Sequence, residues 1–454
     1  MQTHRAPPRR RAGVRHPRWP ATAALGENPS VTDLLEDLQW RGLIADSTDR
    51  DELAALLGGS QTFYCGFDPT AASLHVGNLV QILTMRRLQD AGHRPLALVG
   101  GATGLIGDPK SSGERSLNAA ETVTAWSQRI ESQLRHFLDF DDSASNRAAM
   151  VNNYSWTEGL GAIELLRDIG KHFSVNRMLD REAVRARLEG SGISYTEFSY
   201  QLLQAYDYVR LHLDHGCMLQ TGGSDQWGNI TAGVDLVRRM TGDSVHALTT
   251  PLLEKADGTK FGKTESGTVW LDPDLTPPYA FYQFWVNADD RDVAQYLKVF
   301  SLRPRAEIEE LLTSSQERPH ARLAQVALAE ELTSLVHGEA ACLAVQTASQ
   351  ALFGRQELQD QDPGALSAAL REAGERTVAR AELDAGLPVV DLLAASELVA
   401  GKGAARRMIK EGGAYLNNER ITDETRVVTA DDLLNDEWLV VRRGRKNFVG
   451  VHVV

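Results

Sequence analysis

The strongest constraint on the fold is a change of hydrophobic period between residues 62 and 101. The segment TFYCGF (62–67) is a short apolar run, as expected of a buried strand. It is followed by HVGNLVQILTMRRLQDAG, whose apolar residues fall on one face of a helix, and then by the continuous apolar run PLALVGG (95–101). Such a run predicts a strand that is covered on both faces. Strand, helix and strand in this order predict a parallel β-α-β unit with a right-handed crossover.

The following segments extend this α/β scheme and then depart from it. Helices are predicted at 159–170 and 197–213, and a strand at CMLQTGG (217–223). Residues 289–354 contain helical patterns rich in Ala, Leu and Glu, whereas DPGALSAALREAGERTVAR (362–380) is more polar and predicts a connector. A small α+β module is expected from about Leu387, with a hairpin turn at LNNERI.

Charge is distributed unevenly along the chain. The net charge of −13 argues against a protein coated for nucleic acid, yet LVAGKGAARRMIK and VRRGRKNF are strongly basic. A local basic patch on an acidic protein suits a defined polyanion site, with an ordinary solvated face as the alternative. The basic residues of these two segments are Lys402, Arg406, Arg407, Lys410, Arg442, Arg443, Arg445 and Lys446.

Residues 1–30 and the cysteines bear on the cellular compartment. Residues 1–30 are rich in Arg and Pro and lack an acid before Glu27, which predicts a disordered basic tail; a targeting peptide is the alternative. The three cysteines are scattered and form no CxxC pair, which favours a reducing cytoplasm over a disulfide framework or a zinc site. No apolar run approaches the length of a bilayer span, so we expect a soluble protein without a membrane partner.

Two segments lie where parallel α/β sheets bind ligands, beyond the carboxyl ends of their strands. DPTAASLHVGN (68–78) joins the first strand to a helix, whose N-terminus offers unpaired N–H groups to a phosphate. Gly77 permits close approach of a ligand, and His75 can donate to an anionic oxygen; a capped helix with an incidental histidine is the alternative. GGATGLIGDPKSS (100–112) is glycine-rich but fits neither the P-loop nor GxGxxG, so an unliganded tight turn is its alternative.

Two further segments carry polar residues at suggestive spacing. In TEFSYQLLQAYDYVRLH, Tyr200, Gln204 and Asp207 share one helical face, which either lines a pocket or is exposed to solvent. In ADGTKFGKTESGT (256–268), Lys260 and Lys263 lie among glycines. Such a loop can close over a polyphosphate and supply charge in a transition state, or it is simply a polar surface loop.

Five of these stretches, taken in order, resemble one family. HVGN and KFGKT are similar to the two signatures of class I aminoacyl-tRNA synthetases, His-x-Gly-His and Lys-x-Ser-Lys-Ser. YCGFDPT, GGATGLIGDP, TEFSYQLLQAYD, GGSDQWGNI and ADGTKFGKTESG resemble the bacterial tyrosyl-tRNA synthetases over residues 31–450. Asn78 and Thr264 depart from the two signatures, which have His and Ser there.

The resemblance implies an ATP-dependent attachment of L-tyrosine to tRNA(Tyr) through a tyrosyl-adenylate. It implies that Tyr64 and Asp207 bind the tyrosine phenol. The residues implied for the α-amino group are Tyr200, Gln204 and Asp108, and those around the ribose and the substrate carboxylate are Asp68, Gly223, Asp225 and Gln226. The residues implied for the ATP phosphates and pyrophosphate are Thr70, His75, Gly77, Asn78, Lys260 and Lys263. Lys110 and Arg115 lie in a loop that aligns poorly.

The resemblance also implies partners and a domain order. ATP is expected to arrive with Mg²⁺, no protein-bound metal is expected, and the family is a homodimer. The implied division is a basic tail (1–30), a Rossmann-like parallel-sheet catalytic domain (31–276), a helical anticodon-side domain (277–354), a linker (355–386) and a small α+β S4-like RNA-binding domain (387–454). The alternatives are a tryptophan-specific relative, disfavoured by Tyr64, Asp207 and the S4-like tail, and a non-catalytic RNA-binding protein, disfavoured by His75 and the two loop lysines.

Overall fold

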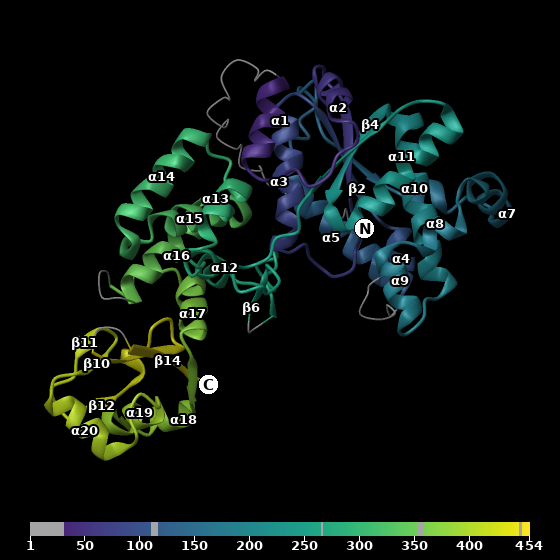
Figure 1. Cartoon of the computed structure of the whole chain (residues 1–454). Coiled ribbons are helices and arrows are strands. Elements are labelled where there is room, and N and C mark those ends of the chain that lie inside the picture. Colours follow the sequence, from purple (N-terminus) through teal and green to yellow (C-terminus); the bar gives the residue numbers. More distant parts are fainter. Residues whose placement is uncertain (1–30, 110–116, 265–266, 353–356, 445–446) are drawn as a thin grey trace, which may run out of the picture.

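The computed structural model describes residues 31–109, 117–264, 267–352, 357–444 and 447–454. Figure 1 shows an α/β part, a helical part beside it and a smaller C-terminal part at the far end of the helices. The tail 1–30, Lys110, Arg115, Arg445 and Lys446 lie outside the described residues. None of the described helices is long and apolar enough to cross a membrane.

The α/β part is built on a five-stranded parallel sheet of order β3-β2-β1-β4-β5. Its strands are β1 Thr62–Phe67, β2 Arg94–Val99, β3 Ala149–Asn152, β4 Cys217–Gly223 and β5 His246–Thr250. Its longer helices are α1 Val31–Trp40, α2 Arg50–Leu57, α3 Val76–Asp90, α5 Ala120–Phe137, α9 Glu182–Glu189, α10 Tyr195–His215 and α11 Trp227–Thr241. The shorter ones are α4 Thr103–Ile106, α6 Tyr154–Thr157, α7 Ala162–Glu164 and α8 Val175–Leu179. The β-α-β unit predicted from residues 62–101 is confirmed as β1, α3 and β2.

Alternation along β1 sends neighbouring side chains to different helical layers. Phe63 and Cys65 join the hydrophobic core that contains α3 and α5. Tyr64, between them, joins the separate core formed with α10 and α11. Successive strand residues point to opposite faces of a sheet, so this single-residue offset directs the Tyr64 phenol toward α10.

The helical part shares the core of the α/β part. Its helices are α12 Pro278–Val286, α13 Val293–Phe300, α14 Arg305–Glu317, α15 Leu323–His337 and α16 Glu339–Leu352. The two-residue strands β6 Lys263–Thr264 and β7 Gly267–Thr268 lie in the loop that precedes them. Trp285 on α12 is fully buried in the same cluster as Leu79 of α3, so the two parts pack as one body.

The C-terminal part is an antiparallel sheet with one parallel edge strand, of order β11-β10-β13-β14-β8. Its elements are α17 Pro363–Glu372, β8 Glu375–Val378, α18 Arg380–Asp384, β9 Leu387–Pro388, α19 Val389–Ala395, α20 Lys402–Lys410, β10 Ala414–Leu416, β11 Glu419–Arg420, β12 Val427–Val428, β13 Trp438–Arg443 and β14 Asn447–Val453. The predicted hairpin at LNNERI joins β10 to β11, with Asn417 at φ 49° and Asn418 at φ 68°. Positive φ at both central residues is what a tight hairpin turn requires, and Asn tolerates it.

Two local expectations are wrong. Residues 362–380, expected as a connector, contain α17 and β8, because Leu366, Ala369 and Leu370 form an apolar face that is fully buried against the helical core. The predicted helix at 159–170 is regular only from Ala162 to Glu164 and continues as a wider π-helical turn, Leu165–Ile169. The predicted helix at 197–213 is confirmed as the slightly longer α10.

Candidate active site

Helix α10 presents its polar stripe inward. The helix starts at the capping residue Ser194, whose hydroxyl accepts from the Glu197 N–H, and it ends at Gly216 in the left-handed conformation. Tyr200 and Asp207 are buried, and the Oε1 atom of Gln204 is buried without a hydrogen-bond partner in the described part of the chain. The stripe therefore lines an interior site, and the solvent-exposed alternative is excluded.

Asp207 and Tyr64 form the deepest part of this site. The Asp207 carboxylate accepts from Asn153 Nδ2 at 3.0 Å and from Trp156 Nε1 at 2.9 Å. Burial raises the pKa of Asp207 to about 7 despite these two donors. The Tyr64 hydroxyl is buried and finds no partner among the described residues, while burial and then Asp207 raise its pKa. An unpaired buried hydroxyl beside a carboxylate is costly unless a ligand completes the hydrogen bonds.

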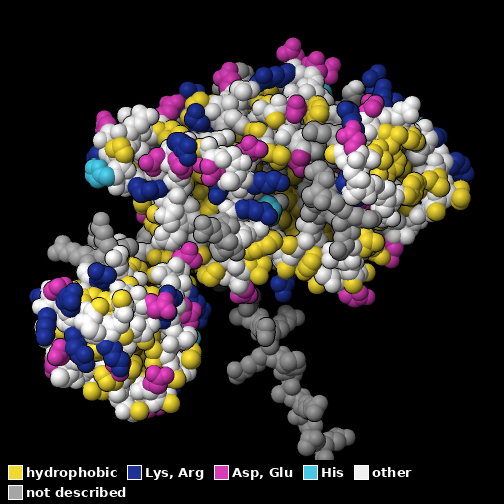
Figure 2. Space-filling model, turned by 60° about the horizontal axis from the view of Figure 1, so that its bottom comes forward, with side chains coloured by type: hydrophobic (Ala, Val, Ile, Leu, Met, Phe, Trp, Pro, Cys, Tyr) yellow, Lys and Arg dark blue, Asp and Glu magenta, His cyan; other side chains and the backbone are white. Residues whose placement is uncertain are grey.

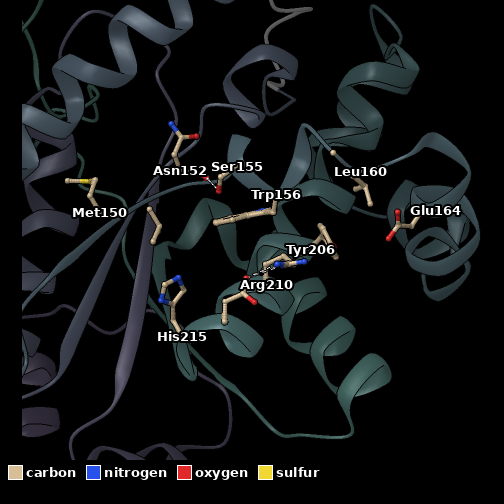
Figure 3. A pocket seen from close by; sticks show the side chains of 12 residues that line it. Met150, Asn152, Ser155, Trp156, Leu160, Glu164, Tyr206, Arg210 and His215 are labelled. Atoms are coloured by element: carbon tan, nitrogen blue, oxygen red, sulfur yellow. Dashed lines mark hydrogen bonds and ion pairs between the residues drawn. The ribbon is translucent and has the colours of Figure 1, made fainter.

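Trp156 connects Asp207 to a cavity of about 590 Å³. Figure 3 shows Trp156 among the side chains that line this cavity, with Arg210 of α10 below it. The indole ring forms part of the cavity lining, and its N–H group orients the carboxylate.

A second polar cluster surrounds Asp68, the first residue after β1. Its Oδ2 atom accepts from the Tyr200 hydroxyl at 2.7 Å, and its Oδ1 atom accepts from Thr103 Oγ1 at 2.6 Å. Burial and then Asp68 raise the pKa of Tyr200, which keeps the phenol protonated as a donor. A Cβ atom at Gly100, the residue after β2, would lie 1.9 Å from Asp68 Oδ1, so only glycine fits beside this carboxylate.

A third cluster joins Asp108 to the segment that follows β4. Gln226 Nε2 donates to Asp108 at 2.9 Å, and Asn229 Nδ2 donates to Asp108 at 3.2 Å and to Gln226 Oε1 at 2.9 Å. Gln226 Nε2 also lies 3.3 Å from the exposed Asp225, which follows Gly223 at the end of β4. A Cβ atom at Gly223 would lie 2.5 Å from Asp225 Oδ1.

Arg181, the capping residue of α9, lies near this third cluster. Its guanidinium lies beside Gly228, where an added Cβ atom would be 2.9 Å from Nε. Burial lowers the pKa of Arg181, and the Asp108 carboxylate opposes that effect. The carboxylate of Asp108 thus has amide donors on one side and a positive charge nearby.

The start of α3 is built from HVGN. His75 is the capping residue, and its Nδ1 atom accepts from the Gly77 N–H at 3.0 Å. Nδ1 must therefore be unprotonated, which places the ring proton on Nε2 as a donor. Burial, followed by Lys263, lowers the pKa of His75, so the ring stays neutral at pH 7. Asn78 Oδ1 accepts from the His75 N–H at 3.0 Å, which completes a capping box.

The KFGKT loop packs directly on this helix start. Gly262 has φ 79°, and a Cβ atom there would lie 2.8 Å from a methyl group of Val76. The side chains of Lys260 and Lys263 are exposed, and Lys263 is close enough to His75 to lower its pKa. Thr70 is exposed in the segment that leads to His75. The structure therefore brings the two signature segments together at one helix N-terminus.

The basic residues of the C-terminal part divide into two groups. Lys402, Arg406, Arg407 and Lys410 are exposed on α20, and Figure 2 shows Lys and Arg side chains gathered on this part of the molecule. Lys402 pairs with Asp391 at 2.8 Å. Arg443 is exposed, whereas Arg442 is only 5% exposed and donates to Asn418 in the hairpin turn. The expectation that Arg442 contacts RNA is therefore corrected, because its side chain holds the hairpin.

Several site residues were missed by the sequence analysis: Asn153, Trp156, Thr103, Asn229 and Arg181. Asn153 follows β3, a strand that the sequence analysis did not recognise. Asn229 lies inside the segment GGSDQWGNI and would have been found by asking what satisfies Asp108. No local sequence pattern distinguishes Arg181, since it is an ordinary charged residue between α8 and α9.

The described residues contain no group of three His, Cys, Asp or Glu side chains arranged to hold a metal ion. The site is instead a set of hydrogen-bond donors and acceptors at the carboxyl ends of parallel strands, beside a helix N-terminus and two exposed lysines. Such an arrangement is able to bind polar ligands and to stabilise charge on a phosphate. The fold and the two signature segments at one helix N-terminus are those of the class I aminoacyl-tRNA synthetases, as the comparisons with known proteins show.

Comparisons with known proteins identify the branch. Residues 58–354 match the family of class I tRNA synthetases (W and Y), and residues 372–451 match the tyrosine--tRNA ligase SYY-like C-terminal domain. The tyrosine--tRNA ligase of Streptomyces coelicolor is 60% identical over 426 residues, covering 93% of this chain and 99% of the relative. That of Thermobifida fusca is 59% identical over 434 residues, with the same coverage of both chains.

A solved structure gives the same result. The C-terminally truncated mitochondrial tyrosyl-tRNA synthetase of Aspergillus nidulans is 32% identical, with a TM-score of 0.63, covering 70% of this chain and 94% of that one. The chain belongs to the tyrosine--tRNA ligase family. Its activity is the ATP-dependent charging of tRNA with tyrosine in translation.

Proposed function

We propose that the three polar clusters and the start of α3 divide the reaction among themselves. The observation that carries this proposal is the unpaired, buried Tyr64 hydroxyl beside Asp207, since a tyrosine phenol would satisfy both groups. Tyr200 and Asp108 then face the α-amino group, with Gln204 beside them. Asp68, Asp225 and Gln226 lie toward the ribose and the substrate carboxylate, at the open ends of the strands.

Adenylate formation follows from this arrangement. The tyrosine carboxylate attacks the α-phosphorus of ATP, the bond to the bridging oxygen breaks, and pyrophosphate leaves with the electron pair. His75 Nε2–H and the amide of Asn78 donate to the phosphate oxygens from the helix N-terminus, where the macrodipole favours negative charge. Lys260, Lys263 and Thr70 stabilise the charge that grows on pyrophosphate. The tRNA 3′-terminal hydroxyl then attacks the tyrosyl carbonyl, and AMP leaves.

Mg²⁺ enters as part of the ATP substrate. Phosphate oxygens and water supply most ligands of Mg²⁺ in such sites, so a dedicated protein cage is unnecessary. The exposed Asp225 carboxylate is available to a hydrated ion bound by the phosphates. We place the enzyme in the cytoplasm, where the three buried free thiols would remain reduced.

A homodimer is supported by an apolar surface on the α/β part. Hydrophobic side chains gather on the side of the molecule where α7 lies (Figure 2). The large apolar residues that are at least 43% exposed between positions 154 and 195 are Tyr154, Ile163, Leu166, Val175, Leu188 and Tyr195. Exposed apolar residues in such number are typical of an interface between chains. Sedimentation equilibrium would test this, and a purely monomeric protein at micromolar concentration would contradict it.

Selection of tyrosine over phenylalanine is expected to depend on the Asp207 carboxylate and on pH. An ionised carboxylate accepts the phenol proton better than a neutral one, and the pKa of Asp207 is about 7. The Kd for tyrosine should therefore fall as pH rises from about 6 to 8. Asp207→Asn should flatten this dependence, because the amide does not titrate.

Tyr64→Phe should reduce discrimination against phenylalanine by about tenfold, since one hydrogen bond is lost.

The measurement is tyrosine-dependent and phenylalanine-dependent ATP–pyrophosphate exchange at three pH values. Tyr208→Phe is the matched control, because the Tyr208 hydroxyl donates to the His246 carbonyl. Equal pH dependence in the Asp207→Asn variant and the parent enzyme would contradict the phenol assignment.

The role of Asn78 can be separated from its capping bond. Its Oδ1 atom is already used by the His75 N–H, so only the Nδ2 group can reach a phosphate. Asn78→Asp keeps the acceptor for the cap but replaces the donor by a negative charge. We expect Asn78→Ala to slow adenylate formation by about fivefold to tenfold and Asn78→Asp to slow it more, although the thermal stability of the Asp variant is kept.

Single-turnover adenylate formation and a melting curve measure the two effects. The His75→Ala variant should form adenylate more slowly still, because the phosphate oxygen to which His75 donates gains charge in the transition state. If Asn78→Asp forms adenylate as fast as the parent enzyme, Asn78 is only a helix cap.

A further inference from the structure

We propose that Asp292 and Tyr296 of α13 are positioning residues that hold the KFGKT loop over the start of α3, and that they set the place of Lys263 during adenylate formation. This inference rests on the proposed role of the loop lysines. It adds two residues of the helical part, outside the substrate site, to the machinery of the reaction.

Asp292 holds the beginning of the loop. It is the capping residue of α13 and is only 6% exposed, yet among the described residues its side chain makes no capping bond to its own helix. Its Oδ1 atom instead accepts from the backbone N–H of Ala256 at 2.9 Å. Aspartate at this position normally satisfies a free N–H of its own helix. Its use on a loop 36 residues earlier in the chain fixes that loop to α13.

Tyr296 holds the middle of the same loop. It lies one turn after Asp292, and burial and then Asp292, which also bonds the phenol, raise its pKa. Its ring packs on Phe261, with centroids 5.1 Å apart, and Phe300 stacks on the same ring at 5.3 Å. Phe261 stands between Lys260 and Gly262, so this aromatic contact fixes the backbone that carries both lysines. Helix α13 therefore contacts the loop at two points, Ala256 and Phe261.

Between these two points the loop is bonded mainly to itself, because Lys255 donates from its backbone N–H to the Thr259 carbonyl and from Nζ to the Lys263 carbonyl at 2.9 Å. A cavity of about 530 Å³ lies between the loop and α12, lined by residues that include Lys255, Val269, Gln283 and Asp292. The position of the loop beside this cavity therefore depends on the Asp292 bond and on the aromatic contacts of Phe261 with α12 and α13. Movement at either anchor is passed on to the start of α3, because the Val269 N–H donates to the Gly262 carbonyl and the Val76 N–H donates to the Val269 carbonyl.

The other end of α13 is fixed to the other end of α3, and the two helices lie side by side (Figure 1). Arg87, in the last turn of α3, donates to the carbonyls of Val299 and Ser301 at 2.9 and 2.8 Å. Helix α3 thus carries His75 at its start and is tied to α13 at its end, while the start of α13 holds the loop. Because α3 and α13 are joined at both ends, the distance between His75 and Lys263 is held constant. Two groups that act on one transition state require such a fixed distance.

The test compares two acidic residues of one turn. Asp292→Ala should slow single-turnover adenylate formation by about tenfold and leave the Kd for tyrosine unchanged, because the lysines are displaced and the tyrosine site is not. Asp290 is exposed and accepts from Gln325 at 2.6 Å, so Asp290→Ala removes the same charge without touching the loop and should stay near the parent rate. Asp292→Asn keeps an oxygen acceptor and should recover most of the loss. Equal rates for Asp292→Ala and Asp290→Ala would overturn the proposal.

A double variant distinguishes a positioning role from a general structural one. If Asp292 acts through the loop, Asp292→Ala should add little to Lys263→Ala, whereas independent effects would multiply. Hydrogen exchange of the peptide covering Ala256–Lys263 should be faster in Asp292→Ala than in Asp290→Ala. If Lys263→Ala alone leaves the rate of adenylate formation unchanged, the proposed role of the lysine is wrong. If hydrogen exchange of the loop is unchanged in Asp292→Ala, Asp292 does not hold the loop.

Discussion

A chain that ends at Ala373 is expected to form tyrosyl-adenylate within about threefold of the full rate but to lose about a thousandfold or more in tRNA charging at moderate salt. The cut removes the exposed lysines and arginines of α20 while keeping α17, whose apolar face packs against the helical part and, at Leu370, also against Gly450 of β14. Phosphate contacts dominate nucleic-acid affinity, whereas the clusters that we propose for tyrosine and ATP lie before the helical part. A C-terminally truncated fungal relative has been solved, which supports the folding of such a fragment.

The two activities are measured by ATP–pyrophosphate exchange and by tyrosine transfer to tRNA on the same preparation.

In the chain with its C-terminal part, the double variant Arg406→Ala, Arg407→Ala should bind tRNA more weakly. The slope of log K against log salt concentration should fall by about one unit for each lost phosphate contact. Arg380→Ala on α18 is the matched control, since this arginine pairs with Asp384 and is outside α20. Normal charging by the truncated chain would show that α20 is not the tRNA anchor.

The arrangement of the α/β part followed from the sequence because its signals were local and in agreement. The apolar runs at 62–67 and 95–101 and the helix between them predicted the β-α-β unit, which places Asp68 and Gly100 side by side at the open end of the sheet. The spacing of Tyr200, Gln204 and Asp207 predicted a shared helical face. Whether that face pointed inward could not be decided from spacing, since polar stripes usually face solvent.

The long-range contacts of the site and of its KFGKT loop were not predictable for a different reason. Asn153 acts on Asp207 across 54 positions and Asp292 acts on Ala256 across 36, and neither contact leaves a periodic pattern. Arg442 shows the opposite error, because a basic cluster predicts exposure although one of its arginines is buried against the hairpin turn. Helix α17 was missed because a single apolar face within a polar segment resembles a connector until its packing partner is known.

Lys260→Ala and Lys263→Ala are each expected to slow adenylate formation by about a hundredfold while changing the Kd for tyrosine by less than about twofold. Both side chains are exposed, so in the absence of substrate they hold little fixed interaction energy. We expect them to contribute when negative charge moves onto the departing pyrophosphate, with the contact of Phe261 and Tyr296 holding their backbone in place.

Pre-steady-state adenylate formation, with tyrosine binding measured separately, distinguishes this role from ground-state binding. Lys171→Ala is the control, since this exposed lysine of the α/β part lies outside the KFGKT loop. The removal of a transition-state contact lowers the rate at saturating ATP, whereas the removal of a ground-state contact raises the ATP concentration needed for half-maximal rate. If the variants regain the parent rate at high ATP, the lysines bind the ground state, and stabilisation of the leaving pyrophosphate must come from the helix N-terminus and His75 instead.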